Sequence, residues 1–201
     1  MTPVAVLLAG GRAQRMGGGD KPLRMLAGRT LFDHVLERVR PQVAAICLNA
    51  NGDPARFAQW GLPVVADPVP DYPGPLAGVL AGLLWARRAH PGAELMLSVP
   101  TDTPFLPRDL VARLLDARAR SGLPLACAAS GGRTHPVVAL WPVSIADELA
   151  AALAGGIRKI DTWTAGFGVA EAVFEDTPFD PFLNVNRPEE LEAAARLVPN
   201  P

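Results

Sequence analysis

The stretch that decides the fold is VAVLLAGGRAQRMGGGDK, residues 4–21, where an apolar run enters a glycine-rich, basic loop. The run Val4–Leu8 predicts a strand that is buried on both faces. Glycines let the loop backbone approach a ligand and turn its N–H groups toward an anion. Arg12, Arg15 and Lys21 add positive charge beside those groups. The stretch therefore predicts a strand followed by a phosphate-binding loop, with a glycine-rich surface turn as the alternative.

The loop differs from two common nucleotide-binding motifs. Asp20 precedes Lys21 and Pro22 follows it, whereas a Walker A loop has Gly before the lysine and Ser or Thr after it. The loop also has no GxGxxG fingerprint. Only its charges and its glycines therefore indicate phosphate binding.

Further short apolar runs follow along the chain, with helical segments between them. This alternation is typical of βαβ units and predicts an α/β fold with a mainly parallel sheet. Thr30 is expected to cap a helix that ends before Pro41, and the last helix is expected to begin near Pro188. The other predicted strands are 45–48, 63–66, 95–99, 125–128 and 137–140, and the other predicted helices are 76–88, 108–120 and one after residue 144.

The chain, residues 1–201, reads as one domain that is soluble and cytoplasmic. No basic residue precedes the first apolar run and two glycines end it, so a buried strand fits better than a signal peptide. The longest other apolar stretch, residues 76–86, is shorter than the roughly 18 residues of a membrane-spanning helix.

The charge balance excludes partners that are recognised through bulk charge. Nineteen basic and twenty acidic residues give a net charge of −1, so neither nucleic acid nor a membrane surface is expected as a partner. Arginine provides all the basic residues except Lys21 and Lys159. Cys47 and Cys127 both lie in apolar runs, and they are predicted to be small buried side chains rather than a disulfide or metal ligands.

Polar residues follow the predicted strands, where parallel sheets bind their ligands. Asn49 to Asn51 follow the second strand, Asp67 the third and Asp102 the fourth. Asp102 can hold Mg²⁺, which takes one or two protein oxygens and leaves its other positions to phosphates and water. Capping of the following segment is the alternative for Asp102.

Asp67 is a candidate for base recognition. A carboxylate can accept from both the ring N–H and the exocyclic amine of guanine, a pair of donors that cytosine and adenine do not offer. A turn-forming role before Pro68 is nearly as compatible with the sequence.

The second half of the chain offers fewer candidates. No serine or cysteine stands in a nucleophile motif, and no histidines have ligand spacing, so covalent catalysis is not expected. His34 and His90 are interpreted as surface residues, whereas His135, next to a glycine pair and Arg133, could line a second pocket. Asn186 is interpreted as the cap of the last helix, which leaves Asn184 without a structural role.

The motifs LAGG, RMGGGDK, NAN, DYPGPLAG, DTP, HP and FLNVN follow one another in this order between Leu8 and Asn186. This ordered set resembles the molybdenum cofactor guanylyltransferases over nearly the whole chain. The resemblance implies a Rossmann-like three-layer sandwich, a mainly parallel sheet flanked by helices. It also implies a Mg²⁺-dependent nucleotidyltransferase that transfers GMP from GTP to molybdopterin, forms the guanine dinucleotide cofactor and releases pyrophosphate. Thr101 stands where the family often has a cysteine of similar size.

The resemblance assigns roles to the matching positions. The N-terminal half is expected to bind GTP and the C-terminal half to bind the pterin. Implied partners are GTP, molybdopterin, and the molybdoenzymes or other cofactor-biosynthesis proteins that take up the product. The resemblance assigns to GTP the residues Leu8, Ala9, Gly10, Gly11, Lys21, Asn49 and Asp67, and it assigns Asp102 to the metal beside the GTP phosphates. The expected catalytic residues are Arg15, Lys21 and Asp102, whose charges would stabilise the transferring phosphate. The candidates for the pterin side come from the half of the chain not used for the nucleotide: His135, Asn184 and Asn186, with Arg133 beside them.

Three other functions remain open on the sequence. A molybdopterin cytidylyltransferase or a sugar-1-phosphate nucleotidyltransferase would share the fold, and the LAGG motif and Asp67 favour guanine over them by resemblance. A non-catalytic nucleotide-binding or carrier protein would keep the loop, but binding alone would not require Asp102.

Overall fold

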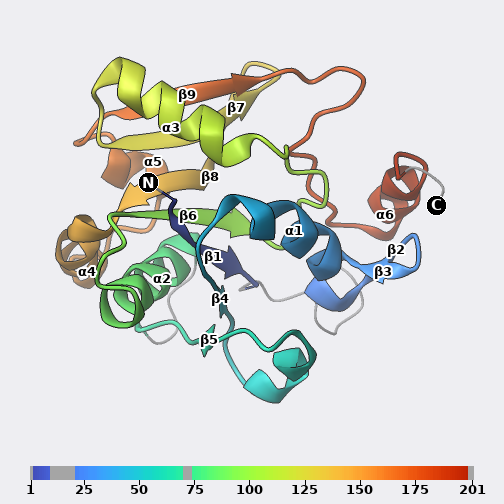
Figure 1. Ribbon diagram of the computed structural model, residues 1–201, viewed down its shortest axis with the longest axis horizontal. Helices are drawn as coiled ribbons and strands as arrows, with labels where there is room; N and C mark the ends of the chain where they lie inside the picture. Colours follow the sequence, from blue (N-terminus) through green and yellow to red (C-terminus); the bar gives the residue numbers. More distant parts are fainter. Residues whose placement is uncertain (1, 10–20, 70–73, 199–201) are drawn as a thin grey trace.

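The computed structural model describes residues 2–9, 21–69 and 74–198. Seven strands form one sheet in the order β5-β4-β1-β6-β8-β7-β9 (Figure 1). The strands are β1 Val4–Leu8, β4 Ile46–Asn49, β5 Val64–Val65, β6 Leu95–Pro100, β7 Leu125–Ser130, β8 Arg133–Pro142 and β9 Val169–Phe174, and a separate hairpin pairs β2 Met25–Leu26 with β3 Arg29–Thr30. The predicted mainly parallel sheet is confirmed, because only β8 runs antiparallel to its neighbours.

Helices cover both faces of this sheet and complete the predicted three layers. On one face, α1 Leu31–Val39 and α3 Leu110–Ser121 pack in a core with the odd-numbered residues of β1. On the other face, α2 Pro75–Ala89, α4 Ala146–Ala154 and α5 Ile160–Thr164 pack in a second core. Period-two alternation along the buried strands explains why one strand contributes to both cores.

The first helix begins where the sequence predicts. Thr30 Oγ1 accepts from the Asp33 N–H at 3.0 Å, and the Asp33 carboxylate accepts from the Thr30 N–H at 3.1 Å. This reciprocal pair is a capping box, which satisfies two N–H groups that the helix cannot pair itself. The helix therefore begins directly after the β2–β3 hairpin and leads the chain back to the sheet.

The long helix α2 lies unusually close to the sheet because glycines face it. A Cβ on Gly82 would come within 2.6 Å of the Val6 Cβ, and one on Gly78 within 2.3 Å of Asn49 Oδ1. Any larger residue at either position would push the helix away from β1 and β4. The glycine spacing thus brings the helix N-terminus to the edge where Asn49 lies.

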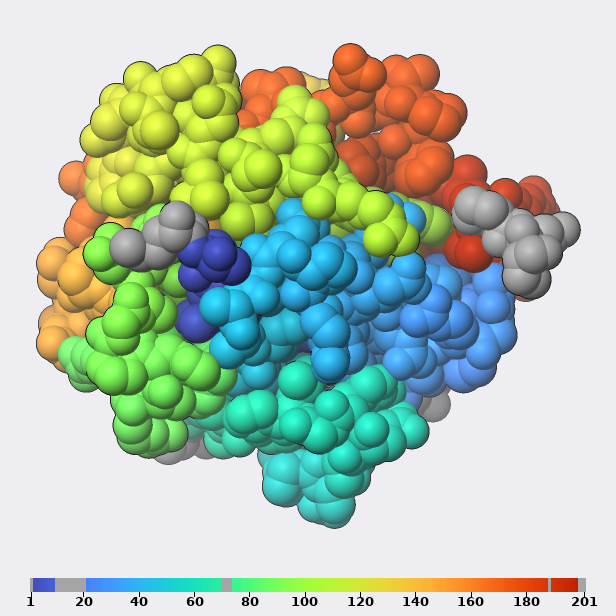
Figure 2. All heavy atoms as spheres, in the orientation of Figure 1, coloured from blue at the N-terminus to red at the C-terminus, as the bar shows by residue number. Residues whose placement is uncertain are grey.

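The last helix, α6 Pro188–Ala195, packs beside the β2–β3 hairpin at one end of the molecule (Figure 2). Leu26, Val185 and Ala194 lie in one small core there. The chain segment between β9 and α6 therefore crosses from the far end of the sheet to the hairpin. This crossing carries Asn184 and Asn186 past the end of β6.

Candidate active site at the carboxyl edge of the sheet

Asp67 lies at the end of β5, held by two asparagine side chains. Asn49 Nδ2 donates to Asp67 Oδ1 at 2.9 Å, and Asn51 Nδ2 donates to Asp67 Oδ2 at 2.7 Å. Asn51 Oδ1 also accepts from the Asp67 N–H at 2.9 Å. Each carboxylate oxygen has a second lone pair, so Asp67 remains able to accept from a base. Asn49 is only 2% exposed, which makes it a rigid support.

Backbone contacts tie the ends of three strands together beside this cluster. The Ala9 N–H donates to the Asn49 carbonyl at 2.9 Å, and Thr101 Oγ1 donates to the Leu8 carbonyl at 3.1 Å. Thr101 is buried, so its hydroxyl takes a structural part that a cysteine could provide only through a weak S–H donor. Leu8, Ala9, Asn49 and Asp102 therefore belong to one connected edge.

Lys21 lies at this edge. Its Nζ donates both to Asp102 Oδ2 and to Asn186 Oδ1. The Lys21 and Asp102 side chains are 17% and 19% exposed, so the pair is largely shielded from water. An ammonium lies here between a carboxylate and an amide oxygen, and hard oxygens of this kind are also the donors that Mg²⁺ takes.

Asn186 differs from its sequence interpretation. The residue that caps α6 is Arg187, and the Glu190 carboxylate accepts from the N–H groups of Asn186 and Arg187 at 2.5 and 3.1 Å. The capping interpretation of Asn186 is therefore wrong. Its side chain is free of the helix because Glu190 satisfies the N–H groups, and it contacts Lys21 instead.

Asn184 lies on the same segment and faces the other side of Asp102. Its Oδ1 accepts from Thr103 Oγ1 at 2.8 Å, and the following Val185 N–H donates to the Asp102 carbonyl at 2.9 Å. The segment thus fixes the loop that carries Asp102 from two directions. Asn184 and Asn186 lie beside the Lys21–Asp102 pair.

His135 belongs to a separate polar cluster near the start of β8. Its Nε2 is 2.7 Å from Ser130 Oγ, which donates to Asp180 Oδ1 at 2.8 Å, and Arg133 pairs with Asp180 at 3.4 Å. Burial lowers the pKa of His135, more than the Asp180 charge raises it. The His135 ring packs on Phe182 with ring centres 4.7 Å apart. This cluster fastens the β7–β8 hairpin to the segment that leads to Asn184.

The site contains residues that the sequence did not predict, and some predicted residues cannot be placed in it. Gly10, Gly11 and Arg15 lie outside the described residues. Asn51, which holds Asp67 together with Asn49, has no role predicted from the sequence, although it belongs to the same NAN motif. Thr103 and Asp180 were missed, since only the folded chain brings them to Asn184 and Ser130.

The histidines and cysteines have structural surroundings. His34 Nε2 contacts the Leu26 carbonyl at 2.9 Å, and His90 packs on Trp85. Cys47 and Cys127 are buried free thiols, as predicted, and burial raises the pKa of Cys47. Among residues 2–9, 21–69 and 74–198, no three His, Cys, Asp or Glu side chains cluster as metal ligands. A metal at Asp102 would therefore take most of its ligands from substrate and water.

Known proteins share this arrangement. The profile of the MobA-like NTP transferase domain matches residues 5–166. A molybdenum cofactor guanylyltransferase of Rhodopseudomonas palustris (strain BisB5) is 57% identical over 195 residues, which cover 96% of this chain and 93% of that protein. The chain belongs to the molybdenum cofactor guanylyltransferases. As a member of this MobA-like family it is a nucleotidyltransferase, so the family resemblance of the motifs is confirmed.

Solved structures agree with this MobA-like fold. Molybdopterin-guanine dinucleotide biosynthesis protein A from Archaeoglobus fulgidus superposes with a TM-score of 0.74 at 23% identity, covering 96% of this chain and 97% of that one. Rv0371C from Mycobacterium tuberculosis H37Rv, in complex with manganese, gives a TM-score of 0.68 at 16% identity, covering 98% and 100%. The Rossmann-like fold is therefore confirmed. Within the described part of this MobA-like chain, no helix is long and apolar enough to cross a membrane.

Proposed function

We propose that the protein transfers GMP from GTP to molybdopterin, yielding the guanine dinucleotide form of the cofactor and pyrophosphate. The observation that carries the proposal is that one sheet edge holds a carboxylate suited to guanine, Asp67, and a second carboxylate paired with a lysine, Asp102. The 57% identical guanylyltransferase adds the substrate class. A cytidylyltransferase would lack a use for Asp67 as an acceptor from guanine.

Asp67 selects the base in this proposal. Its two oxygens accept from the ring N–H and the exocyclic amine of guanine, while Asn49 and Asn51 hold the carboxylate in place. Cytosine presents an acceptor where guanine presents its ring N–H, so the carboxylate would face a lone pair. The tight packing of Gly78 on Asn49 keeps this support rigid.

Asp102 and Lys21 act on the triphosphate. The positive charge of Lys21 stabilises the phosphates. Arg15, which lies outside the described residues, is the second cation that we assign to them. The oxygens of Asp102 and Asn186 fit a divalent cation, which supplies charge neutralisation at the transferring phosphate. A neighbour in the fold is described with manganese, which supports divalent metal use; Mg²⁺ is the ion we propose.

The transfer itself needs no protein nucleophile. An oxygen of the acceptor's terminal phosphate attacks the α-phosphorus of GTP in line, the bond to the β-phosphate bridging oxygen breaks, and pyrophosphate leaves. Positioning and charge stabilisation account for catalysis of such transfers. In this proposal Asn184 and Asn186, next to Asp102, orient the acceptor phosphate.

Product analysis tests this proposal. The protein is incubated with Mg²⁺, molybdopterin and either GTP or CTP, and pyrophosphate and dinucleotide are quantified. Dinucleotide from GTP alone is expected. Product from CTP alone would identify a cytidylyltransferase, and absence of product from both would favour a carrier protein; either result would overturn the proposal.

A further inference from the structure

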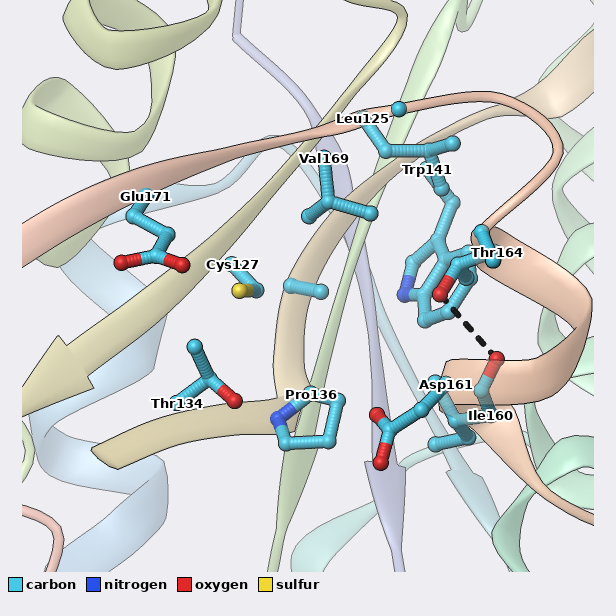
Figure 3. Close-up of a pocket in the computed structure, with 13 residues that line it drawn as sticks. Leu125, Cys127, Thr134, Pro136, Trp141, Ile160, Asp161, Thr164, Val169 and Glu171 are labelled. Atoms are coloured by element: carbon cyan, nitrogen blue, oxygen red, sulfur yellow. Dashed lines mark hydrogen bonds between the residues drawn. The ribbon is translucent and has the colours of Figure 1, made fainter.

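A cavity of about 250 Å³ lies at the other end of the sheet, between β7, β8, β9 and α5 (Figure 3). Small-molecule pockets span roughly 300–1,000 Å³, so this cavity suits one ring system rather than a whole dinucleotide. Its apolar wall includes Cys127, Ala139 and Trp141. Trp141 is held by its Nε1–H, which donates to Ser98 Oγ at 2.7 Å.

An irregularity in the sheet shapes the cavity. Cys127 of β7 pairs with Ala139, but the next residue, Ala128, pairs with His135, so β8 bulges between these two partners. Bulges re-aim side chains and occur next to active sites. Here the bulge turns His135 toward Phe182, whereas its neighbours Thr134 and Pro136 line the cavity. The pterin-side role predicted for His135 therefore does not extend to this cavity.

The cavity lies one strand away from the strand that precedes Asp102, because β8 lines the cavity and pairs with β6. Val137, next to the lining residue Pro136, accepts at its carbonyl from Ser98 Oγ at 2.6 Å. Ser98 lies on β6, which leads directly into Asp102. A Cβ on Gly74, at the N-terminus of α2, would lie 3.5 Å from the Arg158 carbonyl, just before α5. These contacts connect the elements that line the cavity to the elements that carry the nucleotide residues.

The charged groups of the cavity are two carboxylates without a partner among the described residues, and the hydroxyls of Thr134 and Thr164 also line it. Glu171 and Asp161 line it, and neither carboxylate forms a hydrogen bond or ion pair with any described residue. Both act on Cys127: burial together with the charges of Glu171 and Asp161 raises the pKa of this thiol to about 11. Figure 3 shows Glu171 and Thr134 on the same side of the cavity, beside Cys127. None of the described lining residues is basic.

This chemistry favours a ring with adjacent N–H donors and disfavours a phosphate. A pterin presents an amino group, a ring N–H and a carbonyl in a row. A carboxylate can accept from the first two while a hydroxyl donates to the carbonyl. The acidic cavity would repel the phosphate of the same molecule, which would then lie toward Lys21.

We propose that the cavity binds the pterin ring of the acceptor, with Glu171 accepting from its amino group and ring N–H and Thr134 donating to its carbonyl. This proposal rests on the proposed function and adds the site of its second substrate. Guanine and the pterin both present an amino group beside a ring N–H. Asp67 and Glu171, at opposite ends of the sheet, would therefore accept the same pair of hydrogen bonds from the two ring systems of the product.

Binding of free pterin tests the proposal. Calorimetry is performed with saturating Mg²⁺ and GTP, since free pterin has no phosphate and cannot react. Saturable binding is expected, with about a tenfold or greater loss in Glu171→Gln and a smaller loss in Thr134→Val. Lumazine, which replaces the amino group by a carbonyl, should bind at least about tenfold more weakly than pterin.

The control is Glu192→Gln on the exposed surface of α6, which should bind pterin as wild type does. Unchanged melting temperatures would show that the variants fold, and both altered side chains are exposed. The proposed pterin site would be overturned by equal binding of pterin and lumazine, by wild-type affinity in Glu171→Gln, or by no binding of pterin. GTP-dependent product formation by the wild-type protein would still support the function, so the two failures are distinguishable.

Discussion

The two ends of the sheet hold their acidic groups in opposite ways. At the end formed by β5, β4, β1 and β6, Asp67 accepts from two asparagines and Asp102 pairs with Lys21. At the end formed by β8, β7 and β9, Glu171 and Asp161 have no described partner. The first end is organised before a ligand arrives, whereas the second keeps its acceptors open. Preorganisation favours charge stabilisation at the end where we propose that GMP is transferred.

Removing the charge of Asp102 should have the largest effect on activity, because Asp102 belongs to the end of the sheet that is organised in advance. Asp102→Asn keeps the side-chain shape and its place between Lys21 and Asn186, but it loses the carboxylate that suits a divalent cation. We expect the transfer rate to fall about 10²–10³-fold with an unchanged melting temperature. Steady-state pyrophosphate release measures the rate. Turnover like that of the wild type would remove Asp102 from the metal site.

Changing Asp67 should alter base choice rather than catalysis. In Asp67→Asn an amide N–H₂ replaces one acceptor, so GTP binding should weaken about tenfold to a hundredfold. Xanthosine triphosphate has a carbonyl in place of the guanine amine and should lose less affinity, or gain some. Competition binding of the two nucleotides measures this. An unchanged preference for GTP would place the base elsewhere.

Lys21→Ala should weaken nucleotide binding and leave the fold intact. The ammonium contacts Asp102 and Asn186 from the first residue of a short 3-10 helix and packs in no hydrophobic core, so its loss removes the proposed phosphate contact without opening a cavity. We expect about a tenfold loss of GTP affinity by calorimetry. Lys159→Ala, the other lysine, is the matched control. Equal affinities in both variants would exclude Lys21 from the site.

The smallest effect should come from His135, and it should appear as pH-dependent stability. Because burial lowers its pKa in the folded protein, the unfolded chain binds the proton more readily. The contribution of neutral His135 to the free energy of unfolding is complete above its ordinary pKa of 6.5, and it falls as the pH drops below that value. The melting temperature should decrease by a few degrees from pH 7 to pH 5, and less in His135→Gln. Identical pH profiles would contradict this.

Local patterns in the sequence predicted most of the fold. The buried strand Val4–Leu8 and the Thr30 cap are determined by neighbouring residues, so both were predicted correctly. Strand β9 was not predicted: its alternation of buried and exposed residues is short, and it pairs with β7 some forty residues earlier. Because Glu171 lies on this strand, the cavity could not be predicted from the sequence either.

The candidate site was predictable where its residues end strands. Asp67 and Asp102 follow apolar runs, so a parallel sheet brings them to one edge. Asn186 could not be assigned in this way, since its contact with Lys21 spans 165 positions and depends on how the segment before α6 crosses the sheet. Glu190 likewise takes over the capping of that helix, which short-range rules attributed to Asn186.

The fate of the three phosphates tests the central claim most directly. The protein is given molybdopterin, Mg²⁺ and GTP that carries a radioactive label on either the α- or the γ-phosphate. We predict that the α-label appears in the pterin product and the γ-label only in pyrophosphate. A γ-label on the pterin, or no label on it from either nucleotide, would contradict GMP transfer at this edge of the sheet.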